Sequence, residues 1–135
     1  MVIHHLEGIL DLKLLDSILA SVEKPARYMG GELNMTQKCD AELRFALAFP
    51  DVYEIGMSHL GSRILYHVLN AREDTICERV FAPWPDMERA LRENQIPLFT
   101  LETKRSLGTC DIIGFSLLYE MCYTNILTML DLAGI

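Results

Sequence analysis

The first apolar pattern along the chain has the spacing of an amphipathic helix. Four residues follow one another at i, i+3, i+4 and i+7, so they would share one helix face. We expect this helix over about residues 11–23, with Pro25 stopping it and a glycine-containing loop at residues 28–32. The residues of this stripe are Leu15, Ile18, Leu19 and Val22.

Short apolar runs further along the chain predict the strands of a sheet. Each run is bounded by proline, glycine or charged residues, as buried strands commonly are. We expect the third run, at residues 98–101, to lie at an edge of the sheet. The fourth, at residues 111–117, is expected at the centre because its apolar residues are continuous. The runs occupy residues 44–49, 78–82, 98–101 and 111–117.

Helical patterns follow three of these strands. Residues 60–71 carry an apolar stripe that we expect to face the core, and Asp86 is expected to cap a helix that ends near residue 94. A last helix follows residue 120. The side chains expected to face inward are Leu60, Ile64, Leu65, Val68 and Leu69, then Met87, Ala90 and Leu91, and finally Tyr123, Ile126, Leu127 and Leu130.

The alternation of strand and helix predicts an α/β fold, in which helices cover both faces of a parallel sheet in three layers. We expect residues 1–40 to form a helix and loop extension, and residues 41–135 to form the main domain. Gly134 has the position of a helix C-cap that would lead into another strand, and sheets of this class have about five strands. The sheet is therefore expected to be truncated before its last strand.

Charge and hydropathy exclude two classes of partner. Twelve Lys and Arg residues against nineteen Asp and Glu residues give a net charge of −7, and no basic cluster is present, so the sequence predicts no nucleic-acid binding. Charged residues interrupt every apolar run well before the roughly 20 residues of a membrane span. No signal peptide is recognisable. We expect a cytoplasmic protein that does not interact with membranes.

The four cysteines are widely separated and predict no metal site. Zinc and iron–sulfur sites usually take thiolates from short spacings, because one turn of chain presents two of them to the metal. Isolated cysteines in a reducing compartment are typical of small apolar core residues. They are Cys39, Cys77, Cys110 and Cys122.

Ligands of parallel α/β sheets bind at the carboxyl ends of the strands, so the loops after the strands carry the candidate chemistry. In residues 51–61, Gly56 would allow close approach of the backbone to a ligand, although a tight turn with Ser58 as helix cap explains the same residues. Trp84 lies between two prolines, where a rigid indole suits stacking on a planar ligand or covering the edge of the core. Ser116 lies at a strand end near Tyr119, where its hydroxyl could meet a ligand or a helix N-terminus.

Two short motifs in these loops resemble the cobalamin (vitamin B12)-binding domain. Asp51 and Gly56 match its D-x-H-x-x-G loop, and Ser116 and Leu118 match its S-x-L motif. Four longer segments are more specific, and they resemble the N-terminal region of B12-binding-domain-containing radical S-adenosylmethionine (SAM) proteins. They lie at residues 24–32, 44–61, 78–88 and 111–120.

The resemblance implies a flavodoxin-like fold of the cobalamin-binding type and a corrinoid as ligand. Tyr53 stands where the cobalamin-binding family has the histidine that coordinates cobalt, and a phenol is a poor ligand for cobalt. The resemblance therefore implies base-off, histidine-off binding. The cysteine motif that holds the radical SAM cluster is absent from this sequence. SAM and a [4Fe-4S] cluster are expected only in the remainder of the parent protein, and this chain alone is not expected to be catalytic.

We therefore interpret the chain as the N-terminal domain of a radical SAM protein, holding a corrinoid beside the catalytic barrel of the same protein. One alternative is a degenerate domain that has lost corrinoid binding and recruits a partner or substrate. Another is an independent module that binds a flavin or a nucleotide. The candidate cofactor-binding residues are Asp51, Tyr53, Gly56, Met57, Ser58, Trp84, Ser116, Leu118 and Tyr119.

Overall fold

A computed structural model of the chain describes residue 10, residues 12–38 and residues 40–135. Asp11, at the start of the first expected helix, lies outside the described residues, as does Cys39. Two single-turn 3-10 helices accompany the regular elements, at Leu107–Thr109 and Glu120–Cys122. The regular elements are α1 (Leu12–Leu19), α2 (Ala26–Met29), β1 (Leu43–Phe49), α3 (Tyr53–Ser58), α4 (Leu60–Asn70), β2 (Thr75–Phe81), α5 (Pro85–Glu93), β3 (Ile112–Phe115) and α6 (Tyr123–Ala133).

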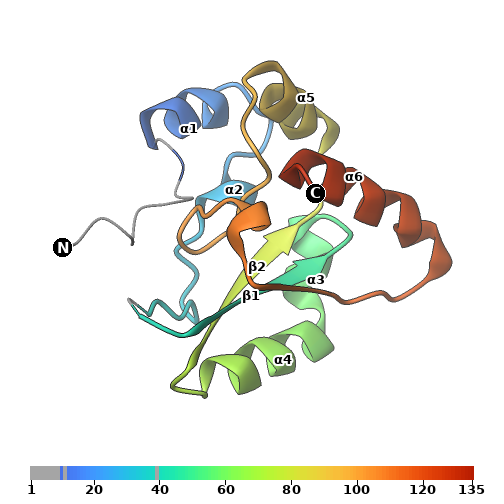
Figure 1. The fold of residues 1–135 in the computed structure, drawn as a ribbon. Coiled ribbons are helices and arrows are strands. Elements are labelled where there is room, and N and C mark those ends of the chain that lie inside the picture. The colour runs from blue at the N-terminus through green and yellow to red at the C-terminus, as the bar shows by residue number, and fades with distance from the viewer. Residues whose placement is uncertain (1–9, 11, 39) are drawn as a thin grey trace.

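The three described strands form one parallel sheet in the order β2-β1-β3. This is the order of the first three strands in flavodoxin-like folds. Helix α4 packs on one face, and α1, α5 and α6 lie on the other (Figure 1). The prediction of a three-layer α/β fold with a parallel sheet is therefore confirmed.

The central strand β1 separates two apolar clusters because its side chains alternate between the faces. Ala46 and Ala48 are fully buried beneath α5 and α6, where small side chains let the helices approach the sheet. Leu47 points to the opposite face and packs with Tyr66 of α4 and Cys77 of β2. The larger cluster also contains three residues of the predicted N-terminal stripe, which are Leu15, Ile18 and Val22.

One strand assignment and one strand position predicted from the sequence are wrong. The expected edge strand at residues 98–101 is a buried irregular segment with a single antiparallel bridge, between Phe99 and Ser106. Its amides bond in different directions, from Leu98 to the carbonyl of Leu132 and from Leu101 to the carbonyl of Arg79. The run expected at the centre, β3, lies at an edge of the sheet because β1 occupies the centre.

Two helices bury a different face from the one predicted. The expected core stripe of α4 is 48–64% exposed at Leu60, Ile64, Leu65 and Val68, and the helix instead buries Ser62 and Tyr66. On α6 the expected inward residues Tyr123 and Leu127 are exposed, and the buried residues include Met129 and Leu132. Apolar spacing identifies residues that share a face, but does not by itself decide which face meets the sheet.

Several local boundaries also differ from the predictions. The expected loop at residues 51–58 contains α3, and Pro25 precedes the short helix α2. His59 caps α4 in place of Ser58, because its ring nitrogen accepts a hydrogen bond from the Ser62 amide. The expected cap of α5, Asp86, lies inside its first turn, and Trp84 occupies the cap position.

The described cysteines behave as apolar residues. Cys77 and Cys122 are buried and Cys110 is partly buried. Burial raises the pKa of the Cys77 thiol to about 12 and that of Cys110 to about 11, which makes both thiols unreactive at neutral pH. Within the described ranges there is no cluster of three His, Cys, Asp or Glu side chains placed to hold a metal ion. The same ranges contain no helix that is both long and apolar enough to cross a membrane.

A pair of matched leucine substitutions tests which helix faces meet the core. Leu91→Ala removes a fully buried side chain of α5, so we expect it to lower the free energy of unfolding by about 2–5 kcal/mol. Leu65→Ala, on the exposed face of α4, should lower it by less than about 1 kcal/mol. Urea denaturation followed by circular dichroism measures both. Equal losses would mean that α4 packs through its apolar stripe after all.

Candidate functional site

The residues predicted to bind a ligand lie in two separate places. Asp51, Trp84 and Tyr119 lie near the carboxyl ends of the strands, and we call them the carboxyl-edge group. Tyr53, Gly56 and Met57 belong to α3 and lie beside a cavity on the α4 face of the sheet. The sequence placed all six around one ligand, but the fold distributes them between two surfaces.

Two members of the carboxyl-edge group border a small cavity of about 240 Å³. Asp51 and Trp84 line it together with Asn125 of α6, whose amide donates a hydrogen bond to the carbonyl of Pro50. The Tyr119 hydroxyl donates to Asp51 Oδ2 at 3.1 Å, so the segment after β3 is tied to the segment after β1. This is the edge of a parallel sheet at which ligands commonly bind.

Trp84 is a partly exposed side chain held from two sides. Its backbone amide donates to the Tyr28 hydroxyl at 3.0 Å, and the guanidinium carbon of Arg27 lies 4.9 Å from the centre of the indole ring. Arg27 is in turn paired with Glu54 of α3 at 2.9 Å. One face of the indole therefore already carries a cation–π partner.

Three other predicted residues line neither cavity. The Ser116 amide donates to the carbonyl of Ala48 at 2.9 Å and so continues the pairing of β3 with β1. Ser58 is exposed, and its hydroxyl donates to the carbonyl of Ile55. Leu118 is exposed on the segment after β3.

The α3 residues of the first motif are engaged by other parts of the chain. The Tyr53 hydroxyl donates to Glu32 Oε1 at 2.9 Å, and its ring packs edge-on against Phe81. Burial, together with the hydrogen bond to Glu32, raises the pKa of Tyr53 to about 12. Gly56 is buried beneath Phe81, and a Cβ atom at this position would lie only 2.3 Å from the ring. The absence of a side chain at Gly56 therefore serves packing within the chain.

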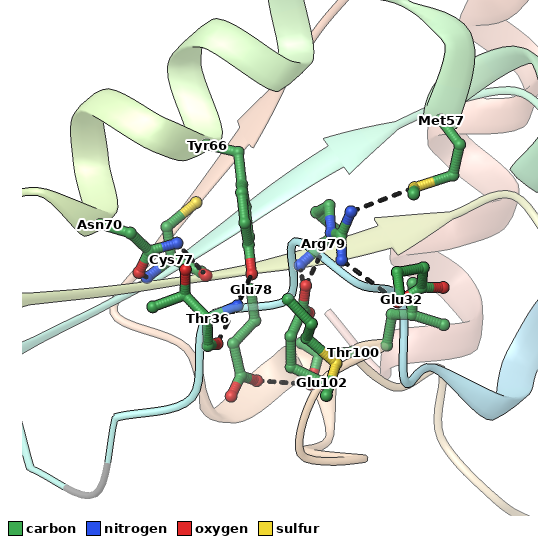
Figure 2. A network of polar contacts seen from close by, with 12 residues as sticks. Glu32, Thr36, Met57, Tyr66, Asn70, Cys77, Glu78, Arg79, Thr100 and Glu102 are labelled. Carbon is green, nitrogen blue, oxygen red and sulfur yellow. Dashed lines mark hydrogen bonds and ion pairs between the residues drawn. The ribbon is translucent and has the colours of Figure 1, made fainter.

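The centre of the α4 face is a buried guanidinium, that of Arg79 on β2. Figure 2 shows how four segments converge on it. Glu102 accepts from both the Arg79 backbone amide and Nε, each at 2.7 Å, and Glu32 accepts from Nη2 at 3.3 Å. Met57 Sδ lies 3.2 Å from Nη1, and the Tyr66 ring stacks on the guanidinium at 4.4 Å. We call these five residues the Arg79 cluster.

Opposing effects act on the charges of this cluster. Burial disfavours the charge on Arg79, but attraction to Glu102 and the hydrogen bonds with it prevail and raise the pKa of the arginine. Burial also raises the pKa of Tyr66 to about 12. Nearby, burial lowers the pKa of Lys104, whose ammonium donates to the carbonyls of Met29 and Leu101. Burial also raises the pKa of Glu102, whereas attraction to Arg79 and the hydrogen bonds with it act in the opposite direction.

Apart from Met57, the residues of the Arg79 cluster were not among the predicted site residues. A signal was available, because Glu78 and Arg79 are adjacent charges inside a predicted strand, and buried charges need partners. Glu78 points to the opposite face, where it accepts hydrogen bonds from Thr100 and Thr103. The carboxylate and hydroxyl partners of both residues lie outside the helices and strands, so their positions could not be predicted. They are Glu32, Glu102, Thr100 and Thr103.

Substituting Tyr53 tests the contact between α3 and Glu32. Tyr53→Phe should lower the free energy of unfolding by about 1 kcal/mol at neutral pH, because the hydrogen bond to Glu32 is lost. Between about pH 10 and pH 12 the unfolded chain loses the Tyr53 proton while the folded chain keeps it. The free energy of unfolding should therefore fall as the pH rises through this range. The fall should be less steep in Tyr53→Phe, which lacks this titrating group.

Two measurements check this prediction, the tyrosinate absorbance during an alkaline titration and urea denaturation at each pH. Tyr53→Phe should remove one of the tyrosines that ionise late, and Glu32→Gln should make Tyr53 ionise earlier. An unchanged late phase in Tyr53→Phe would contradict the contact.

Comparison with known proteins gives one match. Residues 61–135, from α4 to the C-terminal end of the sequence, match the family model described as radical SAM proteins, N-terminal. No curated protein and no solved structure matches the chain. The matched segment covers more than half of the 135 residues and includes β2, β3, Arg79 and Glu102. The chain therefore belongs to the family of N-terminal regions of radical SAM proteins.

Proposed function

We propose that this chain is a docking domain, which holds the catalytic part of its radical SAM protein through the segment that follows β3. The observation that carries the proposal is a run of large apolar side chains that are 39–83% exposed. The run extends from the end of β3 into α6, inside the segment that matches the family. Its members are Leu117, Leu118, Tyr119, Met121, Tyr123 and Leu127, and we call them the docking run.

The position of the docking run supports contact with other protein. It follows an edge strand, and β3 pairs only with β1 within the described sheet. The outer edge of such a strand offers backbone donors and acceptors to further polypeptide. Tyr123 and Leu127 are four residues apart, so they share one face of α6. Large exposed apolar surfaces of this kind mark sites of interaction.

The proposed occupant is the catalytic part of the same radical SAM protein. Membership of the family implies SAM and an iron–sulfur cluster in the parent protein. Within the described residues there is no set of side chains that could hold a cluster. The contribution of this domain would be to fix and shield the catalytic part, while the radical chemistry takes place elsewhere in the parent.

Corrinoid binding is the second candidate, favoured by the place of the carboxyl-edge group. The residues of the first motif do not fit a corrinoid, however. The Tyr53 hydroxyl is bonded to Glu32, the space above Gly56 is filled by Phe81, and the 240 Å³ cavity beside Asp51 is far smaller than a whole corrinoid. These observations favour the degenerate, protein-binding alternative over the cofactor carrier.

A charge placed on the docking run tests the docking proposal in the full-length protein. Leu118→Asp should lower the stability of the assembled protein by about 2 kcal/mol or more, because it buries a carboxylate at the interface. The matched control is Leu65→Asp, since the two leucines are 49% and 48% exposed. The control should cost less than about 0.5 kcal/mol. Differential scanning calorimetry measures both, and equal effects would contradict docking through this run.

Absorbance spectroscopy separates docking from cofactor binding. A titration of the full-length protein with hydroxocobalamin should leave its spectrum unchanged if the domain only docks. A saturable shift toward a base-off spectrum that is lost in Ser116→Trp and retained in Leu65→Asp would replace docking with corrinoid binding. A yellow protein on purification, with bound flavin, would favour the independent module instead.

A further inference from the structure

The largest cavity among those described has the dimensions of a ligand site and lies away from the docking run. Its volume is about 640 Å³, within the range of roughly 300–1,000 Å³ that is typical of small-molecule sites. It is bounded by the sheet, by α3 and α4, and by residues 32–36, and it is partly open to solvent. Its apolar surface comes largely from Leu47, Phe49, Met57, Leu60, Ile64 and Phe81.

The segment that closes one side of this cavity is fixed in place. Gly30 and Gly31 both have a positive φ, of 71° and 88°, which favours glycine, and they direct the chain over the edge of β2. Beyond them, Glu32 is held by Tyr53 and Arg79, and the Thr36 amide donates to the Tyr66 hydroxyl at 2.9 Å. A ligand would therefore meet a cavity that is already formed, which lowers the entropic cost of binding.

Arg79 supplies a polar anchor in the cavity wall. Its side chain is only 10% exposed, and Nε and Nη2 are engaged by Glu102 and Glu32. Nη1 has the Met57 thioether as its partner, and sulfur is a weak acceptor. A ligand oxygen that replaced this sulfur would gain a charge-assisted hydrogen bond in a buried setting. The flexible Met57 side chain can move aside at little cost.

The charges and rings around the cavity indicate the class of ligand. Arg63 of α4 also lines it, so a second guanidinium lies at its wall. Among the described residues that line the cavity, the one carboxylate is that of Glu32, which is already bonded to Tyr53 and Arg79. Phe49 and Phe81 present aromatic surface, which suits another ring. We propose that this cavity binds a small aromatic carboxylate, whose carboxylate takes the place of the Met57 sulfur on Arg79.

Calorimetric titration of the full-length protein with 3-phenylpropionate tests the proposal. We expect saturable binding of this carboxylate. The neutral amide 3-phenylpropanamide should bind about tenfold or more weakly, and the cation 2-phenylethylamine should not bind. Ile64→Trp places an indole into the cavity and should weaken binding of the carboxylate at least about tenfold. The matched control Val68→Trp, one turn further along α4, should leave it unchanged, since Ile64 and Val68 are 54% and 55% exposed and only Ile64 lines the cavity.

Two further variants separate the anchor from the fold and from docking. Met57→Leu removes the sulfur without removing apolar volume, so it should leave binding intact or strengthen it. Leu118→Asp should leave binding unchanged, because the docking run does not line this cavity. No saturable binding of 3-phenylpropionate, equal affinity for the carboxylate and the amine, or equal weakening by Ile64→Trp and Val68→Trp would each overturn the proposal. None of these results depends on the outcome of the docking test.

Discussion

The burial of one guanidinium on β2 constrains much of this fold. A charge removed from water needs partners, and Arg79 finds Glu102 on the segment after α5, Glu32 on the segment before β1, and the Tyr66 ring on α4. Each partner brings its own piece of chain to the α4 face of the sheet. The irregular segments at residues 30–38 and 98–106 owe their positions to these bonds and to those of Lys104, which joins Met29 to Leu101.

Because Arg79 takes its partners from distant parts of the chain, some features of the fold could be predicted from the sequence and others could not. Three of the four apolar runs became strands of the predicted parallel sheet, as buried runs bounded by turns commonly do. The run at residues 98–101 did not, because its amides bond to Leu132 and Arg79 in different directions. The buried face of α4 could not be predicted, because Tyr66 meets Arg79 through a cation–π contact that no periodicity records. The first motif was placed around a ligand, but Tyr53 and Gly56 are used by Glu32 and Phe81, which are distant in sequence. Contacts of this kind depend on the tertiary fold.

The chain offers two surfaces with different character. The docking run after β3 is open, apolar and continuous with an edge strand, as expected for a surface that meets more protein. The cavity beside Arg79 is concave, preformed and lined by aromatic rings and guanidinium groups, as expected for a small ligand. Under the two proposals, their separation would let the domain hold a catalytic partner through one surface and bind a ligand at the other. The Arg79 cluster would then link ligand binding to the stability of the domain.

We infer that the Arg79–Glu102 pair holds both irregular segments against the sheet, and native-state amide hydrogen exchange of the Glu102→Gln variant measures this. We expect faster exchange at Leu101, whose amide donates to the Arg79 carbonyl, and at Thr36, whose amide donates to Tyr66. Exchange at Ala46 and Ala48 in the centre of the sheet should change much less. Unaltered protection at Leu101 and Thr36, or an equal loss of protection throughout the sheet, would contradict the claim.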